Sequence, residues 1–146
     1  CCPRCGKLEP GPAQLMAATP DQVRRVVKHL PLPMHAQAEP AALAAIAAQR
    51  QGKFWEMHDG LFMTQQWTPN TVTETATRVG LDMTRFQADL NSQETRMQLA
   101  KDKADAQAAE VAATPSVFVN GRPVRERSLP ALQAMVNEAL AAQGAK

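Results

Sequence analysis

The feature that most constrains this chain is a pair of cysteines two residues apart, Cys2 and Cys5, separated by Pro3 and Arg4. Cysteines at this spacing lie on one helical turn, close enough to form or open a disulfide without backbone movement. Pro3 fits the first turn of a helix, where its missing N–H leaves no hydrogen bond unmade. Cys2 would then lie at the helix N-terminus, where free N–H groups and the helix dipole favour the thiolate. Arg4 adds a positive charge, so the sequence predicts a redox-active Cys2.

Two other interpretations of the pair are weaker. A zinc site needs about four ligands, but the only further cysteine is the adjacent Cys1, and His29, His35 and His58 show no paired spacing. No metal is therefore expected. A purely structural disulfide would close so small a loop that it would restrain little chain entropy. Cys1 itself is interpreted as incidental, with a second reactive thiol or a mispairing hazard as the alternatives.

A second informative stretch lies far downstream, where residues 113–121 read ATPSVFVNG. Val117 and Val119 alternate with other residues, as in a pleated strand, and the Asn-Gly pair that ends the stretch suits a tight hairpin turn. Pro123 cannot donate a backbone hydrogen bond, so residues 122–125 are predicted to form an edge strand.

These motifs resemble those of the DsbA-like branch of the thioredoxin superfamily, the disulfide oxidoreductases of the bacterial envelope. The resemblance implies that Cys2 is the attacking cysteine and Cys5 the resolving one. It also implies that Pro115 is a cis-proline facing them, with Thr114 before it. The matching segments, in the family's order, are 2–5, 28–35, 51–59, 80–82, 114–115 and 119–121. One departure is Arg-Glu-Arg at 125–127, where many relatives have a glycine, and it alters one rim of the substrate groove.

The fold class implied is α/β, a thioredoxin-like fold with an inserted α-helical subdomain. We expect a single domain over 1–146, with the helical insertion at approximately 36–112. Residues 22–30, with three valines, are expected to form a buried strand. Such a fold needs another strand just before its Cys-x-x-Cys helix, whereas this chain opens at the motif. The expectation is therefore that the chain as given is N-terminally truncated, without that strand or any export signal.

Helical periodicity and capping residues predict the remaining elements. His58 is expected to be a packed, hydrogen-bonded histidine, and the charged run at 101–105 a solvated face. The first three expected helices are 2–18 with a kink at 11–12, an alanine-rich helix ending at 51, and 54–65. The next helix is opened by a Thr71/Glu74 capping box and closed by Gly80, and a short one capped by Asp82 follows. The last two are 92–112, with Met97, Ala100, Ala104, Ala108 and Val111 on its inner face, and a helix capped by Ser128 whose residues 141–146 are expected to fray.

Composition and charge narrow the class of partner. The 146 residues carry a net charge of +2, with 45% hydrophobic and 21% charged residues, as in an ordinary globular domain. So small a charge, without a polybasic block, gives no reason to expect nucleic acid. Transmembrane insertion needs about 18 or more consecutive apolar residues, and none occur. The compartment rests on the resemblance alone, which points to a periplasmic or otherwise extracytoplasmic site.

The expected function is thiol:disulfide oxidoreductase, oxidising cysteines of exported proteins. Cys2 and Cys5 would be catalytic, Pro3 and Arg4 would tune the thiolate, and Thr114–Pro115 would offer its backbone edge to an extended substrate. The Cys2–Cys5 disulfide is itself the redox group, so no separate cofactor is expected. Partners would be protein thiols or disulfides and a membrane-bound re-oxidising or reducing protein. The alternatives are a reductase or isomerase, or a thioredoxin-like binding module appended to a larger protein.

Overall fold

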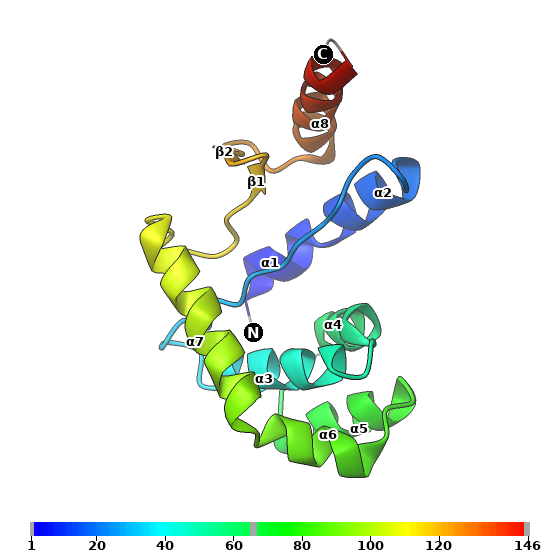
Figure 1. The fold of residues 1–146 in the computed structure, drawn as a ribbon, viewed down its shortest axis with the longest axis vertical. Helices are drawn as coiled ribbons and strands as arrows, with labels where there is room; N and C mark the ends of the chain where they lie inside the picture. The colour runs from blue at the N-terminus through cyan, green and yellow to red at the C-terminus, as the bar shows by residue number, and fades with distance from the viewer. Residues whose placement is uncertain (1, 65–66, 145–146) are drawn as a thin grey trace. The chain divides into compact units, whose positions relative to one another are not determined.

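The computed structural model describes residues 2–64 and 67–144, and within them the chain is mostly helical with one small β-hairpin (Figure 1). The elements in chain order are α1 (Pro3–Leu8), α2 (Pro10–Ala18), α3 (Ala38–Gln49), α4 (Phe54–Met63), α5 (Pro69–Arg78), α6 (Met83–Leu90), α7 (Gln93–Ala108), β1 (Phe118–Val119), β2 (Arg122–Pro123) and α8 (Leu129–Gly144).

The described chain divides into two compact units. The first, which we call the helical unit, runs from Lys28 to Ala112 and contains α3 to α7. The second, which we call the cysteine unit, combines Cys2–Val27 with Ala113–Lys146. The cysteine unit therefore joins segments from opposite ends of the sequence, and it holds both cysteines of the Cys-x-x-Cys motif, the hairpin and α8.

The helical unit is organised around α3, which contacts α4, α5, α6 and α7. Helix α3 is rich in alanine, which favours helix formation. The small alanine side chains let the neighbouring helices approach α3 closely. Larger side chains from the surrounding helices, above all Met57 and Phe86, fill the space beside it with no exposed surface. At Gly60 of α4, an added Cβ would lie 2.7 Å from the Thr75 side chain of α5. Small residues therefore set the spacing of these helices.

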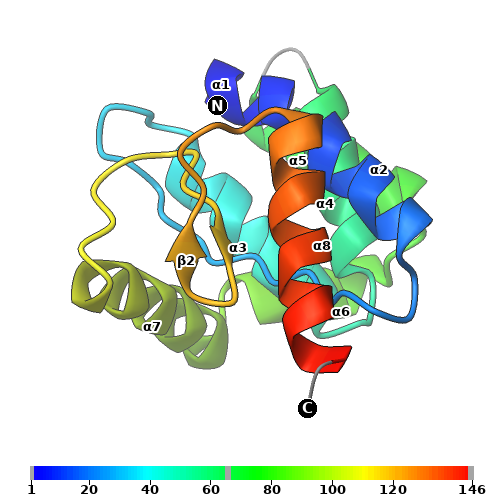
Figure 2. The same ribbon diagram turned by 90° about the horizontal axis from the view of Figure 1, so that it is seen from above.

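The cysteine unit has a smaller core, formed where α8 packs beside α2 and β1 (Figure 2). Its buried apolar residues are Leu15, Val124, Leu132 and Val136. The hairpin is antiparallel, with Phe118 opposite Pro123. Asn120 and Gly121 have positive φ values of 47° and 79°, the geometry of a tight hairpin turn. The prediction of a hairpin here is confirmed, although its strands are shorter than expected.

The helix that follows the cysteines breaks earlier than expected. The break lies at Glu9, between α1 and α2, rather than at residues 11–12. Pro10 has no N–H for an α-helical bond to the preceding turn, so a new helix begins with Pro10 in its first turn, where proline is tolerated.

The expected strand at residues 22–30 is wrong as secondary structure, because no described strand pairs with it. Its burial nevertheless alternates like that of a strand: Val23, Arg25 and Val27 are half-buried, whereas Val26 is 63% exposed. A strand is defined by backbone pairing, which alternation in the sequence cannot supply.

Helix termini follow the predicted capping residues in three of four places. Asp82 caps α6 by accepting the Arg85 N–H at 3.0 Å, and Ser92 caps α7. The Ser128 hydroxyl accepts the Ala131 N–H at 3.4 Å near the start of α8. The capping box before α5 is formed by Thr68 and Thr71 instead of Thr71 and Glu74, because Pro69 already occupies the first turn. Gly80 follows that helix with φ 73°, as predicted.

The predicted inner face of α7 is wrong. Met97 is 62% exposed, whereas Thr95, Leu99 and Asp102 are buried. An acid in a charged run is buried here because its carboxylate accepts the His29 N–H at 3.1 Å and the Gln98 amide at 3.0 Å. The helix also ends at Ala108 rather than near 112.

The ends of two helices also need comment. Helix α8 continues to Gly144, so residues 141–144 are helical rather than frayed, and residues 145–146 lie outside the described residues. Gln65, the expected last position of the helix beginning at Phe54, also lies outside them.

Candidate active site

Cys2 caps the helix on which Cys5 lies. It precedes α1 with extended backbone geometry, and its sulfur accepts the backbone N–H of Cys5 at 3.3 Å. The Cys2 carbonyl also accepts N–H groups from Cys5 and Gly6, at 3.0 and 3.2 Å. A serine or aspartate side chain usually plays this part at a helix start. Here a sulfur atom satisfies a donor that the helix leaves free, and a thiolate satisfies it better than a thiol does.

The two thiols have opposite pKa shifts. Partial burial acts to raise the pKa of Cys2, but hydrogen bonds from the side chain and N–H of Cys5, from the Thr114 side chain and from the Arg4 N–H outweigh it, and the pKa lies below its usual value. The pKa of Cys5 is raised to about 11, first by its burial and then by its hydrogen bond with Cys2 and the nearby Cys2 charge. As the pH rises, therefore, Cys2 loses its proton before Cys5 does.

Pro3 and Arg4 lie between the two cysteines in the first turn of α1. Pro3 is the first helical residue, where a missing N–H costs nothing. Arg4 contributes its backbone N–H to Cys2, while its side chain is exposed to solvent. The group of Arg4 that touches the sulfur environment is therefore the peptide N–H, which every residue except proline would provide.

Thr114 and Pro115 lie beside Cys2, although 112 residues separate them in the sequence. The Cys2 thiol donates to the Thr114 carbonyl with 3.8 Å between the two heavy atoms, and the Thr114–Pro115 peptide bond is cis. Both residues are half-buried and precede β1. The six residues singled out from the sequence thus lie in one unit, and the structure brings Cys2, Cys5 and Thr114 into contact.

This arrangement can perform thiol–disulfide exchange. Both cysteines are free thiols in the structure, and Cys2 is the one with the lower pKa. A thiolate is the attacking species in such exchange, and a thiol of lower pKa is also the better leaving group. Cys5 keeps its proton to higher pH, so it is the less nucleophilic thiol of the pair.

Sequence reasoning missed two ionic features. Glu9 forms an ion pair with Arg25, with 2.5 Å between their charged atoms. Glu9 follows Cys5 by four residues, about one helical turn, and this spacing could have drawn attention to it. No pattern in the sequence identifies Arg25 as its partner. In the helical unit, the buried Asp102 also pairs with Lys28 at 3.2 Å. An alternating run of charges gives no indication that one of them is buried.

His58 is packed and hydrogen-bonded, as predicted, and the two tryptophans also take part in packing. The His58 ring lies 4.9 Å from that of Phe62 and 5.3 Å from that of Trp55, measured between centroids, and its Nδ1 is 3.0 Å from an Asp59 oxygen. Trp67 packs against the main core of the helical unit.

A comparison with known protein families decides the family. The family model described as thioredoxin matches residues 1–138, nearly the whole chain. The chain belongs to the thioredoxin family. Among solved structures, a thioredoxin-like oxidoreductase from Silicibacter pomeroyi is 31% identical with a TM-score of 0.84, over 94% of this chain and 80% of the other.

Two DsbA structures share the fold of this thioredoxin-family chain. The oxidoreductase DsbA from Xylella fastidiosa has a TM-score of 0.77 at 21% identity, covering 99% of this chain and 82% of the other. DsbA from Pseudomonas aeruginosa has a TM-score of 0.72, also at 21% identity, over 98% and 81%. The thioredoxin-like, DsbA-like fold expected from the sequence is thus confirmed.

The curated relatives are much longer proteins. The Na(+)/H(+) antiporter NhaA 1 of Salinispora arenicola is 39% identical over 143 residues, which are 96% of this chain but 22% of that protein. The antiporter NhaA 3 of Salinispora tropica is 42% identical over 123 residues, 83% of this chain and 19% of that protein. The chain therefore spans about a fifth of the length of these relatives. None of its own described helices is long and apolar enough to cross a membrane.

Proposed function

We propose that this chain exchanges thiols and disulfides through Cys2 and Cys5, and that it acts as an oxidant of cysteines in exported proteins. The observation that carries the proposal is the asymmetry of the pair: the pKa of Cys2 is lowered at the start of α1, whereas that of Cys5 is raised to about 11. A purely structural disulfide requires no such difference between its sulfurs.

The reaction starts from the Cys2–Cys5 disulfide. A substrate thiolate attacks the Cys2 sulfur, the Cys2–Cys5 bond breaks, and Cys5 leaves as a thiolate that takes up a proton because its pKa is high. The product is a mixed disulfide between Cys2 and the substrate. A second substrate thiolate then attacks its own half of that bond, and Cys2 leaves as a thiolate. The substrate loses two electrons as its disulfide forms, and the Cys2–Cys5 pair gains them.

The oxidising direction rests on Cys2 as the leaving group. Hydrogen bonds that stabilise its thiolate stabilise the reduced protein, and a more stable reduced form means a higher redox potential. A reductase or isomerase is the alternative, and the redox potential of the Cys2–Cys5 couple separates them.

The substrates in this proposal are protein thiols, with Thr114 and Pro115 alongside the mixed disulfide. The Thr114 carbonyl is within reach of the Cys2 sulfur, so an extended substrate segment beside Cys2 would meet that backbone. Disulfides persist in oxidising compartments, so the proposed location is periplasmic or otherwise extracytoplasmic. A membrane-bound partner would restore the Cys2–Cys5 disulfide after each cycle.

A second candidate is a thioredoxin-like module of a larger membrane protein, with cysteines that need not turn over substrates. The observation in its favour is that the antiporter relatives match this chain over only about a fifth of their own length. The intact Cys2 and Cys5, with opposite pKa shifts, favour a catalytic role for the module in either setting.

The test is turnover of a dithiol peptide. The oxidised protein is mixed with a peptide containing two reduced cysteines, and peptide disulfide is followed by mass spectrometry. Cys2→Ser should abolish the reaction, and Cys1→Ser should match the parent protein. Cys5→Ser has no disulfide to donate and should not oxidise the peptide, but its Cys2 should attack a disulfide-linked dimer of a one-cysteine peptide, keep one half as a mixed disulfide and release the other half as a thiol. Failure of the parent protein to oxidise the peptide, or full activity of Cys2→Ser, would remove the catalytic proposal and favour the binding module.

A further inference from the structure

The two units carry charge of opposite sign. The cysteine unit contains eight lysines and arginines against four acids, whereas the helical unit contains eight against ten. The small net charge of the whole chain hides this difference. The unit that holds Cys2 is therefore the basic part of the protein, and its formal charge is +4.

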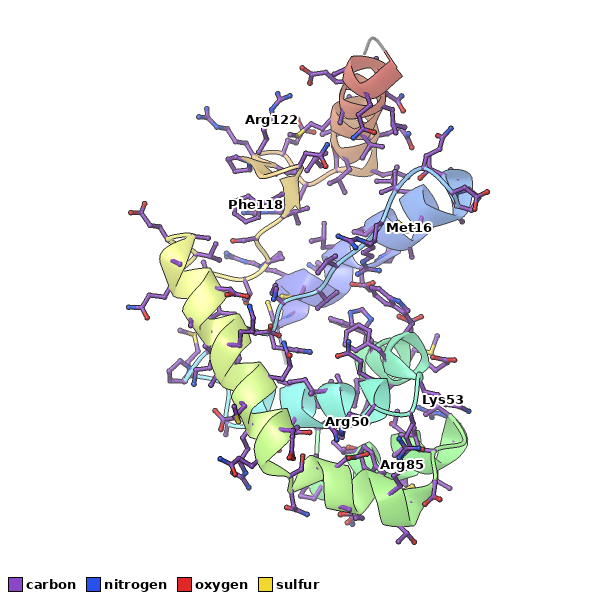
Figure 3. The ribbon with its side chains drawn as sticks, viewed as in Figure 1. Met16, Arg50, Lys53, Arg85, Phe118 and Arg122 are labelled. Carbon is purple, nitrogen blue, oxygen red and sulfur yellow. The ribbon has the colours of Figure 1, made fainter. Side chains whose placement is uncertain are left out.

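Most acids of the cysteine unit are already engaged with neighbours. Glu9 pairs with Arg25, and Glu138 pairs at 3.2 Å with Arg122. Arg122 lies on β2 of the hairpin (Figure 3). Glu126 accepts a hydrogen bond from the Ser128 hydroxyl at 2.7 Å. These contacts neutralise two of the arginines of the unit, Arg25 and Arg122.

Five exposed cations of this unit form no ion pair with any described residue. Two of them, Arg4 and Lys7, lie on α1 three residues apart, and residues at that spacing share one side of a helix. They follow Cys2 by two and five residues, so they lie within about 8 Å of it along the helix axis. The five are Arg4, Lys7, Arg24, Arg125 and Arg127.

We propose that Arg4 and Lys7 form a docking surface for acidic residues that flank the reacting cysteine of a protein substrate. The inference rests on the proposed thiol–disulfide exchange at Cys2. A residue two or three positions from the attacked cysteine in an extended substrate lies about 7–10 Å from it. Along the helix axis the rise from Cys2 is about 3 Å to Arg4 and about 8 Å to Lys7, so such a segment is long enough to pass both. Substrates with Asp or Glu at those positions are therefore the favoured class.

An acidic protein segment fits these observations better than an anionic membrane surface does. Arg4 and Lys7 lie on the same short helix as the redox pair, so a segment that binds them is held near the end of the helix that carries Cys2. No described residue of α1 is a large, strongly exposed apolar side chain that would anchor the helix in lipid. Electrostatic docking of this kind acts mainly on the association rate and weakens with salt.

The experiment compares three reduced dithiol peptides with the oxidised protein. One has Glu two and three positions from the first cysteine, one has Gln there, and one has the Glu residues far from both cysteines. Acidic flanks raise the pKa of a peptide thiol, so each rate is divided by the rate with neutral hydroxyethyl disulfide. The variants are Lys7→Gln and, as the control, Arg96→Gln, which removes an exposed charge from α7 of the helical unit.

The near-acid peptide should react about two- to fivefold faster than the other two at about 20 mM salt, and the preference should disappear at about 500 mM. Lys7→Gln should reduce that preference without slowing the Gln peptide, whereas Arg96→Gln should leave it intact. Equal normalised rates for all three peptides, or equal loss for both variants, would overturn the docking surface while leaving the exchange reaction standing. So would Lys7-dependent binding to anionic vesicles without any peptide preference. No reaction with any peptide would overturn the exchange reaction as well.

Discussion

The helical unit, with 85 residues from Lys28 to Ala112, and the cysteine unit, with 60, differ in how much of their chain is packed into a core. The larger core cluster of the helical unit buries nine residues between closely spaced helices, whereas the core of the cysteine unit buries four. Cys2 and Cys5 lie outside both clusters and are only half-buried. A thiol that attacks other proteins has to be reachable, so the reactive part cannot be the most deeply packed part.

The comparison also separates two uses of polar groups. In the helical unit, the buried Asp102 is satisfied by Lys28, the His29 N–H and Gln98, and this closed network holds residues 28–29 against α7. In the cysteine unit, the sulfur of Cys2 receives hydrogen bonds that favour its charged form and remains half-exposed. The first network stabilises structure, and the second prepares a reaction.

The largest effect on stability is expected from a substitution in the core of the helical unit. Phe86 is completely buried in the helical unit, so Phe86→Ala should lower the free energy of unfolding by about 3–5 kcal/mol through lost burial and a cavity. Denaturant unfolding measures the loss, and alkylation of Cys2 at fixed pH is the control for the other unit. A loss below about 1 kcal/mol would mean that the helical unit is not the better packed one.

A smaller loss is expected from the closed polar network. Asp102→Asn removes the charge that Lys28 and the His29 N–H share, and it should cost about 1–3 kcal/mol. Ser116→Ala is the matched control, because the Ser116 hydroxyl makes one exposed bond to Ala113 in the other unit. If Asp102→Asn and the control have the same midpoint of unfolding, the network does not contribute to stability.

Asp105 gives a test through pH. Hydrogen bonds first from Lys101 and then from Lys28 lower the pKa of Asp105 to about 2. A carboxylate with a lowered folded-state pKa contributes stability that is present above its unfolded value, about 4, and is lost as the pH falls through 2. Asp105→Asn should therefore flatten the decline in stability between about pH 4 and pH 2. An unchanged acid profile in chemical unfolding would show that the exposed pairs are screened.

The smallest effect is expected at Arg4. The backbone N–H that helps to stabilise the Cys2 thiolate remains in Arg4→Ala, and the lost guanidinium is exposed. Removing this cation should lower the redox potential by less than about 30 mV, the equivalent of one pKa unit. Equilibration with glutathione measures it. A rise in potential, or a fall much beyond that value, would show that the side chain acts differently from a screened surface charge.

Local signals in the sequence predicted much of the fold. Asp82, Ser92 and Ser128 act on backbone groups three residues away, and the Asn120–Gly121 turn depends on its own two residues, so these features could be read directly. The strand at 22–30 failed because pairing depends on a distant partner. Asp102 failed because its burial depends on residues 28–29, more than 70 positions away.

In the candidate site, too, only the features that depend on neighbouring residues could be predicted from the residues themselves. The spacing of Cys2 and Cys5 and the position of Pro3 indicate a capped helix with a reactive thiol, and the structure places Cys2 at that cap. The proximity of Thr114 came only from the family resemblance, because no pattern in the sequence connects residues 112 positions apart. The division of the pKa shifts between the two thiols depends on the burial of Cys5 and on hydrogen-bond geometry, which spacing alone does not determine.

The most direct test of the account is the pH dependence of alkylation at each cysteine in the reduced protein. Cys1→Ser removes the third thiol, and peptide mapping by mass spectrometry gives initial rates for Cys2 and Cys5 with iodoacetamide. The lowered pKa of Cys2 and the value of about 11 for Cys5 predict that Cys2 is labelled first, with an inflection shifted to lower pH than that of an ordinary thiol, while Cys5 stays unlabelled until strongly alkaline pH. Labelling of both cysteines with a common inflection, or of Cys5 before Cys2, would contradict the assignment of Cys2 as the attacking thiol.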